Sequence, residues 1–173
     1  YKRQVLGPAI ETALSRVESS TRLVYLSPRG KTFNQQLARK WSKSEGIILI
    51  CGRFEGIDQR VIDHYGIEEV SMGDFVMTGG EIAAQAMIDT TVRLLPNVIG
   101  NRDSLKTESH SNGLIEHDQF TRPNEWKGRK IPQTLTSGNH GKIEYWRENQ
   151  SKSKTKRYRA DLLEKANPAK SKS

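Results

Sequence analysis

The run GIILIC at residues 46–51 constrains the fold more than any other stretch of the chain. After the glycine it places five apolar side chains in succession, without the alternation of apolar and polar residues that marks a strand with one face in water. A strand buried on both faces has this pattern, and such strands occur mainly in parallel sheets covered by helices. The sequence therefore predicts an α/β domain.

Strand and helix patterns alternate on both sides of this run. Further strands are expected at residues 23–26, where SPRG at 27–30 should end the strand, and at residues 68–72. Helical spacing of apolar residues occurs in four segments, at residues 8–17, 32–41, 58–65 and 80–95. This order predicts a mostly parallel sheet with ligand sites at the carboxyl ends of its strands.

The ends and inner faces of some helices can be predicted as well. Proline suits a first helical turn, so the first helix should begin at Pro8. Thr32 and Gln35 resemble a capping box that would begin the second helix. The inner faces should carry Phe33, Leu37 and Trp41 in the second helix, and Ile82, Ala86, Met87 and Val92 in the last.

The net charge of +8 is concentrated at one end of the chain. Residues 126–173 contain 13 lysines and arginines against 4 acidic residues, which leaves 15 against 16 in residues 1–125. A nearly neutral part joined to a basic part indicates a core domain with a polyanion-binding module. The alternative is a basic segment that is merely solvated.

Several kinds of site and location are disfavoured by the sequence. It has neither the GxGxxG turn of dinucleotide sites nor a P-loop, and its four histidines are scattered, so we expect no structural metal. Cys51 is the one cysteine, and in apolar surroundings it should be buried and inert rather than catalytic. The chain has no membrane-spanning run and no secretion signal, so we expect a cytoplasmic protein without a membrane partner.

Three segments follow the predicted strands and should meet at one edge of the sheet. They are residues 26–30, 51–56 and the glycine-bearing VSMGDFVMTGGE at 70–81. Glycines let backbone groups approach a ligand closely, and Phe54 and Phe75 offer apolar surface to a flat ring. Such a pocket suits an adenosine-like ligand better than a triphosphate. The alternative is that the glycines only form tight turns.

These segments resemble a known family. YLSPRGKTFNQ, LICGRFEGIDQRVI, EEVSMGDFVMTGGEIAAQAMID, TRP and LTSGNHGKIEYWR occur in the order and spacing of the bacterial tRNA (guanine-37-N1) methyltransferases, the TrmD family. The similarity runs from about Val5 to Glu164, and about sixty residues of the family pattern are expected to precede it. It implies a SPOUT-type parallel sheet with a deep trefoil knot at residues 1–99, a linker at 100–114 and a small, mainly α-helical, basic domain at 115–173.

The resemblance also implies a cofactor and the residues that bind it. Members of this family bind S-adenosylmethionine in a bent shape, within the knot and largely through backbone groups. The positions that match its binding motifs are Tyr25, Leu26, Ser27, Pro28, Gly52, Phe54, Glu55, Ser71, Met72, Gly73, Asp74, Phe75, Val76, Met77, Gly79 and Gly80. Glu55 and Asp74 could equally cap turns. Magnesium is left open as a second participant.

Methyl transfer to N1 of guanine requires a base that removes the N1 proton and a cation that stabilises the charge developing on O6. The family's base is an aspartate in the linker, and the matching residue here is Glu108. Asp103 is the alternative base. The family's arginine matches Arg93.

The partners implied by the resemblance are a second copy of the chain and the anticodon arm of tRNA. The family forms antiparallel dimers, so Glu108 would act across the interface in a composite active site. The residues expected to hold RNA phosphates are Lys127, Arg129, Lys130, Lys142, Arg147 and the basic cluster at 152–159. Tyr145 and Trp146 are candidates for stacking on bases, although the spacing of Trp146 favours a place in the core.

Three functions remain at this stage. The first is methylation of guanine-37 beside the tRNA anticodon, which supports maintenance of the reading frame. The second is methylation of ribosomal RNA by another SPOUT enzyme, and the third is RNA binding without catalysis. The segment SGNHGKIEYWR favours the first over the second, and Arg93 with the glycine-bearing loops argues against the third. None of the three calls for DNA as a partner.

Overall fold

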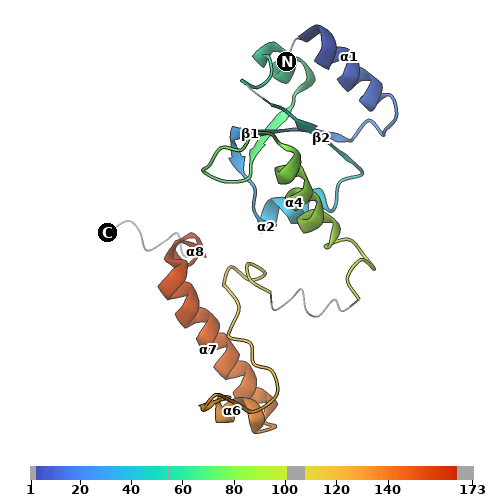
Figure 1. The fold of residues 1–173 in the computed structure, drawn as a ribbon. Helices are drawn as coiled ribbons and strands as arrows, with labels where there is room; N and C mark the ends of the chain where they lie inside the picture. The colour runs from blue at the N-terminus through green and yellow to red at the C-terminus, as the bar shows by residue number, and fades with distance from the viewer. Residues whose placement is uncertain (1–2, 54, 101–107, 167–173) are drawn as a thin grey trace. The chain divides into compact units, whose positions relative to one another are not determined.

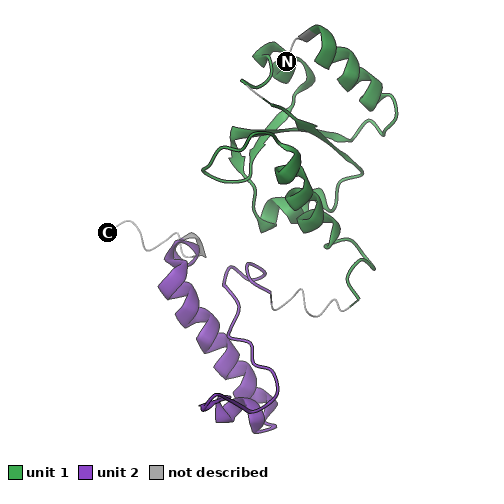
Figure 2. Cartoon of the chain, viewed as in Figure 1, with its two compact units in different colours: residues 1–100 green, residues 101–173 purple. Residues whose placement is uncertain are grey.

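The computed structural model describes residues 3–53, 55–100 and 108–166. The chain divides after Gly100 into two compact units, residues 1–100 and 101–173, which Figure 2 colours green and purple. In the described ranges, no helix is both long and apolar enough to span a membrane.

The first unit is built on a three-stranded sheet (Figure 1). Its strands are β1 (Arg22–Thr32), β2 (Ile47–Cys51) and β3 (Glu68–Ser71), in the order β2-β1-β3. β1 runs parallel to both neighbours, and its register places Leu26 opposite Cys51 on one side and Val70 on the other. The parallel sheet expected from the sequence is therefore confirmed.

Four helices cover the two faces of this sheet (Figure 1). They are α1 (Arg3–Leu14), α2 (Gln35–Trp41), α3 (Gln59–Tyr65) and α4 (Glu81–Val92). α1 packs with α3, and α2 packs with α4. The helices form because an apolar stripe on each can be buried against the sheet, and short helices such as α2 and α3 depend on that burial.

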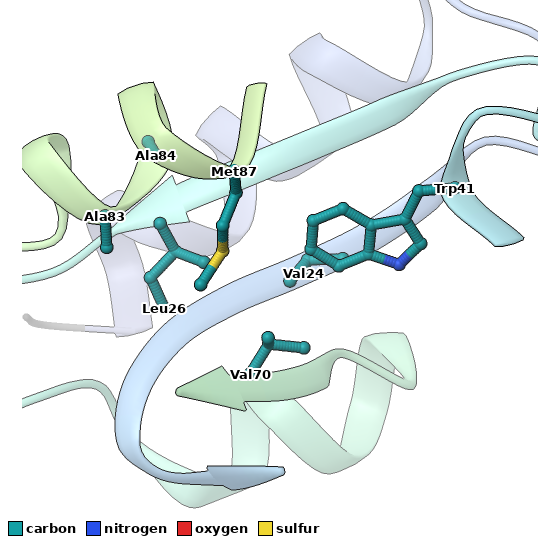
Figure 3. Close-up of a cluster of buried hydrophobic side chains, with 7 residues drawn as sticks. All are labelled: Val24, Leu26, Trp41, Val70, Ala83, Ala84 and Met87. Carbon is teal, nitrogen blue, oxygen red and sulfur yellow. The ribbon is translucent and has the colours of Figure 1, made fainter. Parts of the chain in front are cut away.

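Side chains alternate along β1 and serve two separate cores. Val24 and Leu26 point to one face, where they pack with Val70, Trp41, Met87 and two alanines of α4 (Figure 3). Leu23 and Tyr25 point to the other face and pack with residues of α1 and α3. The two-residue period of a strand explains this division. β1 is therefore the central element of the unit.

β1 continues beyond the SPRG segment, which the sequence analysis expected to end it. Val70 pairs first with Leu26 and then with Lys31, so residues 27–30 leave the ladder with β3 and the strand rejoins it afterwards. The return brings Gly30 against β3, where an added Cβ would lie 2.4 Å from the backbone of Glu69 and Val70. Pro28 and Gly30 therefore interrupt the pairing of β1 locally but do not end the strand.

Two helix starts differ from expectation. Pro8 lies inside α1 rather than in its first turn, because the helix already includes Arg3. α2 is capped by Asn34, whose side-chain oxygen accepts a hydrogen bond of 2.9 Å from the N–H of Leu37, while Thr32 still belongs to β1. Asparagine is a strong N-cap residue, and Asn34 directly precedes the first helical residue, whereas Thr32 lies earlier in the chain. The expected inner face is confirmed for Leu37 and Trp41, whereas Phe33 precedes α2 and packs against the same core from outside the helix.

The face of α4 that meets the sheet also differs from expectation. Ala83, Ala84, Met87 and Thr91 are its buried residues, whereas Ile82 and Val92 are 65% and 40% exposed. The expectation was correct for Met87 and wrong for these two. The small alanines let the helix approach the sheet closely. Because α4 carries apolar residues on both faces, its sequence pattern does not show which face is buried.

The second unit contains α6 (Gln133–Thr136), α7 (His140–Tyr158) and α8 (Ala160–Ala166). It also contains a short antiparallel hairpin, β4 (Glu125–Trp126) and β5 (Arg129–Lys130). Its turn has positive φ at Lys127 and Gly128, as two-residue hairpin turns require. Thr155 of α7 is fully buried and accepts a hydrogen bond of 3.0 Å from the N–H of Ile115, which joins the incoming chain to the helix.

The close approach at Gly30 should make this position intolerant of any side chain. We predict that Gly30→Ala destabilises the first unit by about 3 kcal/mol, the upper end of the usual range for overpacking, because the added methyl meets backbone and not a movable side chain. Chemical unfolding measures this loss. The matched control is Gly100→Ala, since a Cβ there meets no atom within 4 Å. Equal stability of the two variants would contradict the close crossing.

Candidate functional site

A cavity of about 100 Å³ lies at the carboxyl ends of β2 and β3, beside the part of β1 that leaves the ladder with β3. Its walls come from residues 25–28 in the middle of β1, the residues after β2, the end of β3 with the segment after it, and the start of α4. The lining residues are Tyr25, Leu26, Ser27, Pro28, Gly52, Arg53, Val70, Ser71, Met72, Phe75, Val76, Met77, Thr78, Gly79, Gly80 and Ala83. This is the edge at which parallel α/β sheets bind ligands.

Most of the residues expected to bind a cofactor meet in this cavity. Of the sixteen, twelve line it, and Phe54 lies outside the described residues. Glu55, Gly73 and Asp74 are described but do not line it. Sequence reasoning missed Arg53, Val70, Thr78 and Ala83. All four lie inside the quoted motifs, so their neighbours were a usable signal; Val70 and Ala83 belong to the hydrophobic core as well.

Backbone contacts hold the walls of the cavity together. The N–H of Gly80 donates a hydrogen bond of 3.2 Å to the carbonyl oxygen of Gly52, and Arg53 forms an antiparallel bridge with Gly79. In the third segment, the hydroxyl of Ser71 donates to the carbonyl oxygen of Gly73 at 2.9 Å and lies 3.2 Å from its N–H. The loops are therefore arranged before a ligand arrives, which lowers the entropy lost on binding.

Two glycines are required by close packing beside the cavity. A Cβ on Gly52 would lie 2.8 Å from the ring of Tyr25, and a Cβ on Gly80 would lie 3.1 Å from the Cα of Cys51. Both distances are shorter than ordinary carbon–carbon contacts. The glycines thus let the chain pass close to its neighbours and leave backbone groups facing the cavity.

The rim of the cavity carries exposed apolar side chains, and the charge of Arg53 in its wall is neutralised by a carboxylate. Phe75 and Val76 are 54% and 82% exposed although both are large hydrophobic residues. The guanidinium of Arg53 donates a hydrogen bond of 2.9 Å to the carboxylate of Glu81. The pKa of Glu81 is lowered, first by a hydrogen bond from its own backbone and then by Arg53, so this carboxylate stays ionised at neutral pH. Such a site suits a flat, apolar group better than a chain of phosphates.

Cys51 does not offer a nucleophile near this cavity. The side chain is half-buried at the end of β2, and burial, followed by the charge of Glu81, raises the pKa of its thiol. A thiol with a raised pKa contains little thiolate at neutral pH, and the thiolate is the reactive form.

The two candidate catalytic residues lie in different units. Arg93 ends α4 in the first unit, where its N–H bonds to the carbonyl oxygen of Asp89 at 3.1 Å. Glu108 lies in the second unit, and its carbonyl oxygen accepts a hydrogen bond of 3.1 Å from the N–H of Ser111. Asp103, the alternative base, lies outside the described residues. Elsewhere, the described chain has no group of three His, Cys, Asp or Glu residues that could hold a metal ion.

The second unit presents cations together with exposed aromatic rings. Lys127 lies 4.9 Å from the ring centre of Trp126, and Tyr145 of α7 is 70% exposed. Trp146 is partly buried beside Phe120, at 6.1 Å between ring centres. Some of the expected phosphate-binding cations have acidic partners, including Lys152 with Glu148 at 2.6 Å. Basic side chains next to stacking surfaces are typical of proteins that bind RNA.

Comparison with known proteins identifies the family. Residues 2–165 match the family model described as tRNA (guanine-1)-methyltransferase TrmD. Proteins named tRNA (guanine-N(1)-)-methyltransferase are similar to this chain in several bacteria. The one from Ruegeria pomeroyi is 57% identical over 161 residues, which cover 93% of this chain and 66% of that protein.

Two further relatives of the same name give a similar result. The protein of Cereibacter sphaeroides is 59% identical over 140 residues, which are 81% of this chain and 56% of the relative. The protein of Lactobacillus delbrueckii subsp. bulgaricus is 52% identical over 156 residues, which are 90% of this chain and 63% of that relative. The chain thus spans about two thirds or less of the length of these relatives. From the match to the family model and from these identities, the chain belongs to the tRNA (guanine-1)-methyltransferase family TrmD.

Proposed function

We propose that this protein transfers a methyl group from S-adenosylmethionine to N1 of guanine-37 in tRNA, in the cytoplasm. The observation that carries the proposal is the cavity at the carboxyl ends of β2 and β3 and beside residues 25–28 of β1, with its glycine walls and apolar rim, in a chain of this family. The printed names of the relatives, tRNA (guanine-N(1)-)-methyltransferases, support the same reaction.

The cavity fits the adenosine part of the cofactor. Its volume of about 100 Å³ is smaller than the roughly 300 Å³ of a complete ligand pocket, so a bent ligand would place one flat ring inside and the rest along the rim. The exposed ring of Phe75 offers a stacking surface, and backbone groups beside Gly52 and Gly80 can bond to ring nitrogens. We propose that the loops around this cavity form the trefoil knot of the SPOUT fold.

The chemistry follows from the charges that develop on guanine. When bound, S-adenosylmethionine supplies an electrophilic methyl group on a sulfonium ion. We propose that the Glu108 carboxylate takes the N1 proton, while the nitrogen lone pair forms the bond to the methyl carbon and the S–CH₃ electrons return to sulfur. The Arg93 guanidinium would stabilise the negative charge that grows on O6 during this step.

An apolar face on α4 supports a dimer. Ile82, Ile88 and Val92 are 65%, 50% and 40% exposed within one chain, and Ile88 and Val92 are neighbours at i, i+4 on the surface of the helix. Exposed apolar surface of this kind is typical of protein interfaces. We propose that a second copy covers this face, which would let Glu108 of one copy complete the site of the other.

We propose that residues 115–173 hold the anticodon arm, with residues 100–114 as the linker from the cofactor domain at 1–99. The cations of α7 and of the hairpin would contact phosphates, and Tyr145 would stack on a base. Magnesium is a further proposal. Because Mg²⁺ keeps several waters and favours phosphate oxygens, it would join as a hydrated ion near the RNA.

The substrate is tested directly with two tRNA transcripts that differ only in carrying guanine or adenine at position 37. With methyl-labelled S-adenosylmethionine and a range of magnesium concentrations, we predict label in the guanine transcript alone, because adenine carries an amino group in place of O6 and so offers no developing oxyanion for Arg93 to stabilise. Ribosomal RNA is included as a third substrate. Equal labelling of the two transcripts, or label only in ribosomal RNA, would contradict the proposal.

The base is tested by Glu108→Gln, which keeps the shape of the side chain and removes its ability to accept a proton. We predict that methyl transfer falls by about 10²–10⁴-fold, the usual contribution of a general base, while the affinity for S-adenosylmethionine is unchanged. Single-turnover kinetics and calorimetry measure the two quantities. Asp103→Asn is the matched control and should keep full activity. The reverse pattern would assign the base to Asp103.

A further inference from the structure

An open groove of about 680 Å³ lies beside α2 in the first unit, away from the residues of the cofactor cavity. Its walls come from the end of β1, from α2 with the turns at its two ends, and from the start of β3. The lining residues, named here the α2 groove, are Lys31, Thr32, Asn34, Gln36, Leu37, Arg39, Lys40, Lys43 and Glu68.

The stretch of chain that supplies most of the α2 groove carries a local excess of positive charge. Residues 19–44 contain six lysines and arginines and no aspartate or glutamate. Over residues 1–125 this excess is cancelled by acidic residues elsewhere, so the overall balance of 15 against 16 conceals it. The fold gathers four of the six cations into the α2 groove.

The carboxylates that reach this region are already engaged by the other two cations. Glu68, which lines the groove, pairs with Arg22 at 3.2 Å. Glu69 pairs with Arg29 at 2.9 Å. These pairs consume the local negative charge, which leaves the groove with a positive field.

Three lysines of the groove, Lys31, Lys40 and Lys43, are exposed and form no ion pair with any described residue. Lys31 comes from the strand that rejoins β3 after residues 27–30, and the other two come from α2 and the turn after it. The charges therefore converge from separate elements on a concave surface, unlike a solvated stripe along one helix.

The groove matches a polyanion backbone in its chemistry. Ammonium groups are compact charges suited to single phosphate oxygens, and several of them side by side follow a phosphodiester chain. Among the described residues, no aromatic side chain lines the groove, so these residues offer no stacking surface for bases. Gln36 adds an exposed amide that can bond to a ribose hydroxyl.

We propose that the α2 groove binds the phosphate backbone of the substrate RNA. This inference rests on the proposed function, because it takes RNA as the substrate. It gives the first unit an RNA contact of its own, in addition to the basic second unit. Contacts of this kind position the RNA without reading its sequence.

The test replaces Lys31, Lys40 and Lys43 together by glutamine and measures tRNA affinity by fluorescence anisotropy at several salt concentrations. We predict at least tenfold weaker binding at low salt. The slope of log affinity against log salt should also be smaller by about two, because binding releases fewer counterions when phosphate contacts are lost. The matched control replaces the same three lysines by arginine, which keeps the charge. It should retain affinity and slope within about twofold.

Two further readings separate the possible failures. Affinity for S-adenosylmethionine should be equal in the wild type and in both variants, which shows that the first unit remains folded.

If the wild type binds tRNA and the glutamine variant has the same affinity and slope, the groove is not an RNA site. If the wild type binds no tRNA, the proposed function fails together with this inference. If the arginine variant loses affinity as the glutamine variant does, shape and not charge is responsible, and the proposal is overturned.

Discussion

The first unit depends on the burial of β1 on both faces and along both edges. Its side chains alternate between two cores, and its backbone pairs with β2 on one side and β3 on the other. Because this strand cannot shift without disturbing both cores, the ends of its neighbours are fixed beside it. The cavity forms where these ends meet, so the same constraint that stabilises the sheet positions the candidate site.

Local patterns predicted much of this arrangement. The uninterrupted apolar residues of β2 indicated a strand buried on both faces, and the glycine-bearing segments after the strands indicated a pocket at one edge. Both inferences use short-range rules, namely the side-chain period of a strand and the convergence of parallel strand ends. The match of the motifs to a family added the cofactor and the two catalytic candidates, which no periodicity could supply.

The features that sequence reasoning missed arise from longer-range contacts. SPRG has the composition of a turn, yet β1 rejoins β3 after it, because Gly30 can pass within contact of another strand's backbone. Ile82 fits an apolar stripe as well as Ala83 does, and only packing against the sheet selects the smaller residue. Similarly, the α2 groove becomes visible only when the fold brings Lys31 beside α2 and pairs Glu68 with Arg22.

The proposed function requires that the cavity lined by residues 25–28 and by the segments after β2 and β3 bind S-adenosylmethionine. The chain contains three methionines, of which Met72 and Met77 line the cavity and Met87 lies in the core. With ¹³C-labelled methionine methyl groups, titration of the unlabelled cofactor should therefore shift the NMR signals of Met72 and Met77 strongly and that of Met87 much less. If Met72 and Met77 kept their positions at a saturating cofactor concentration, the cavity would not be the binding site.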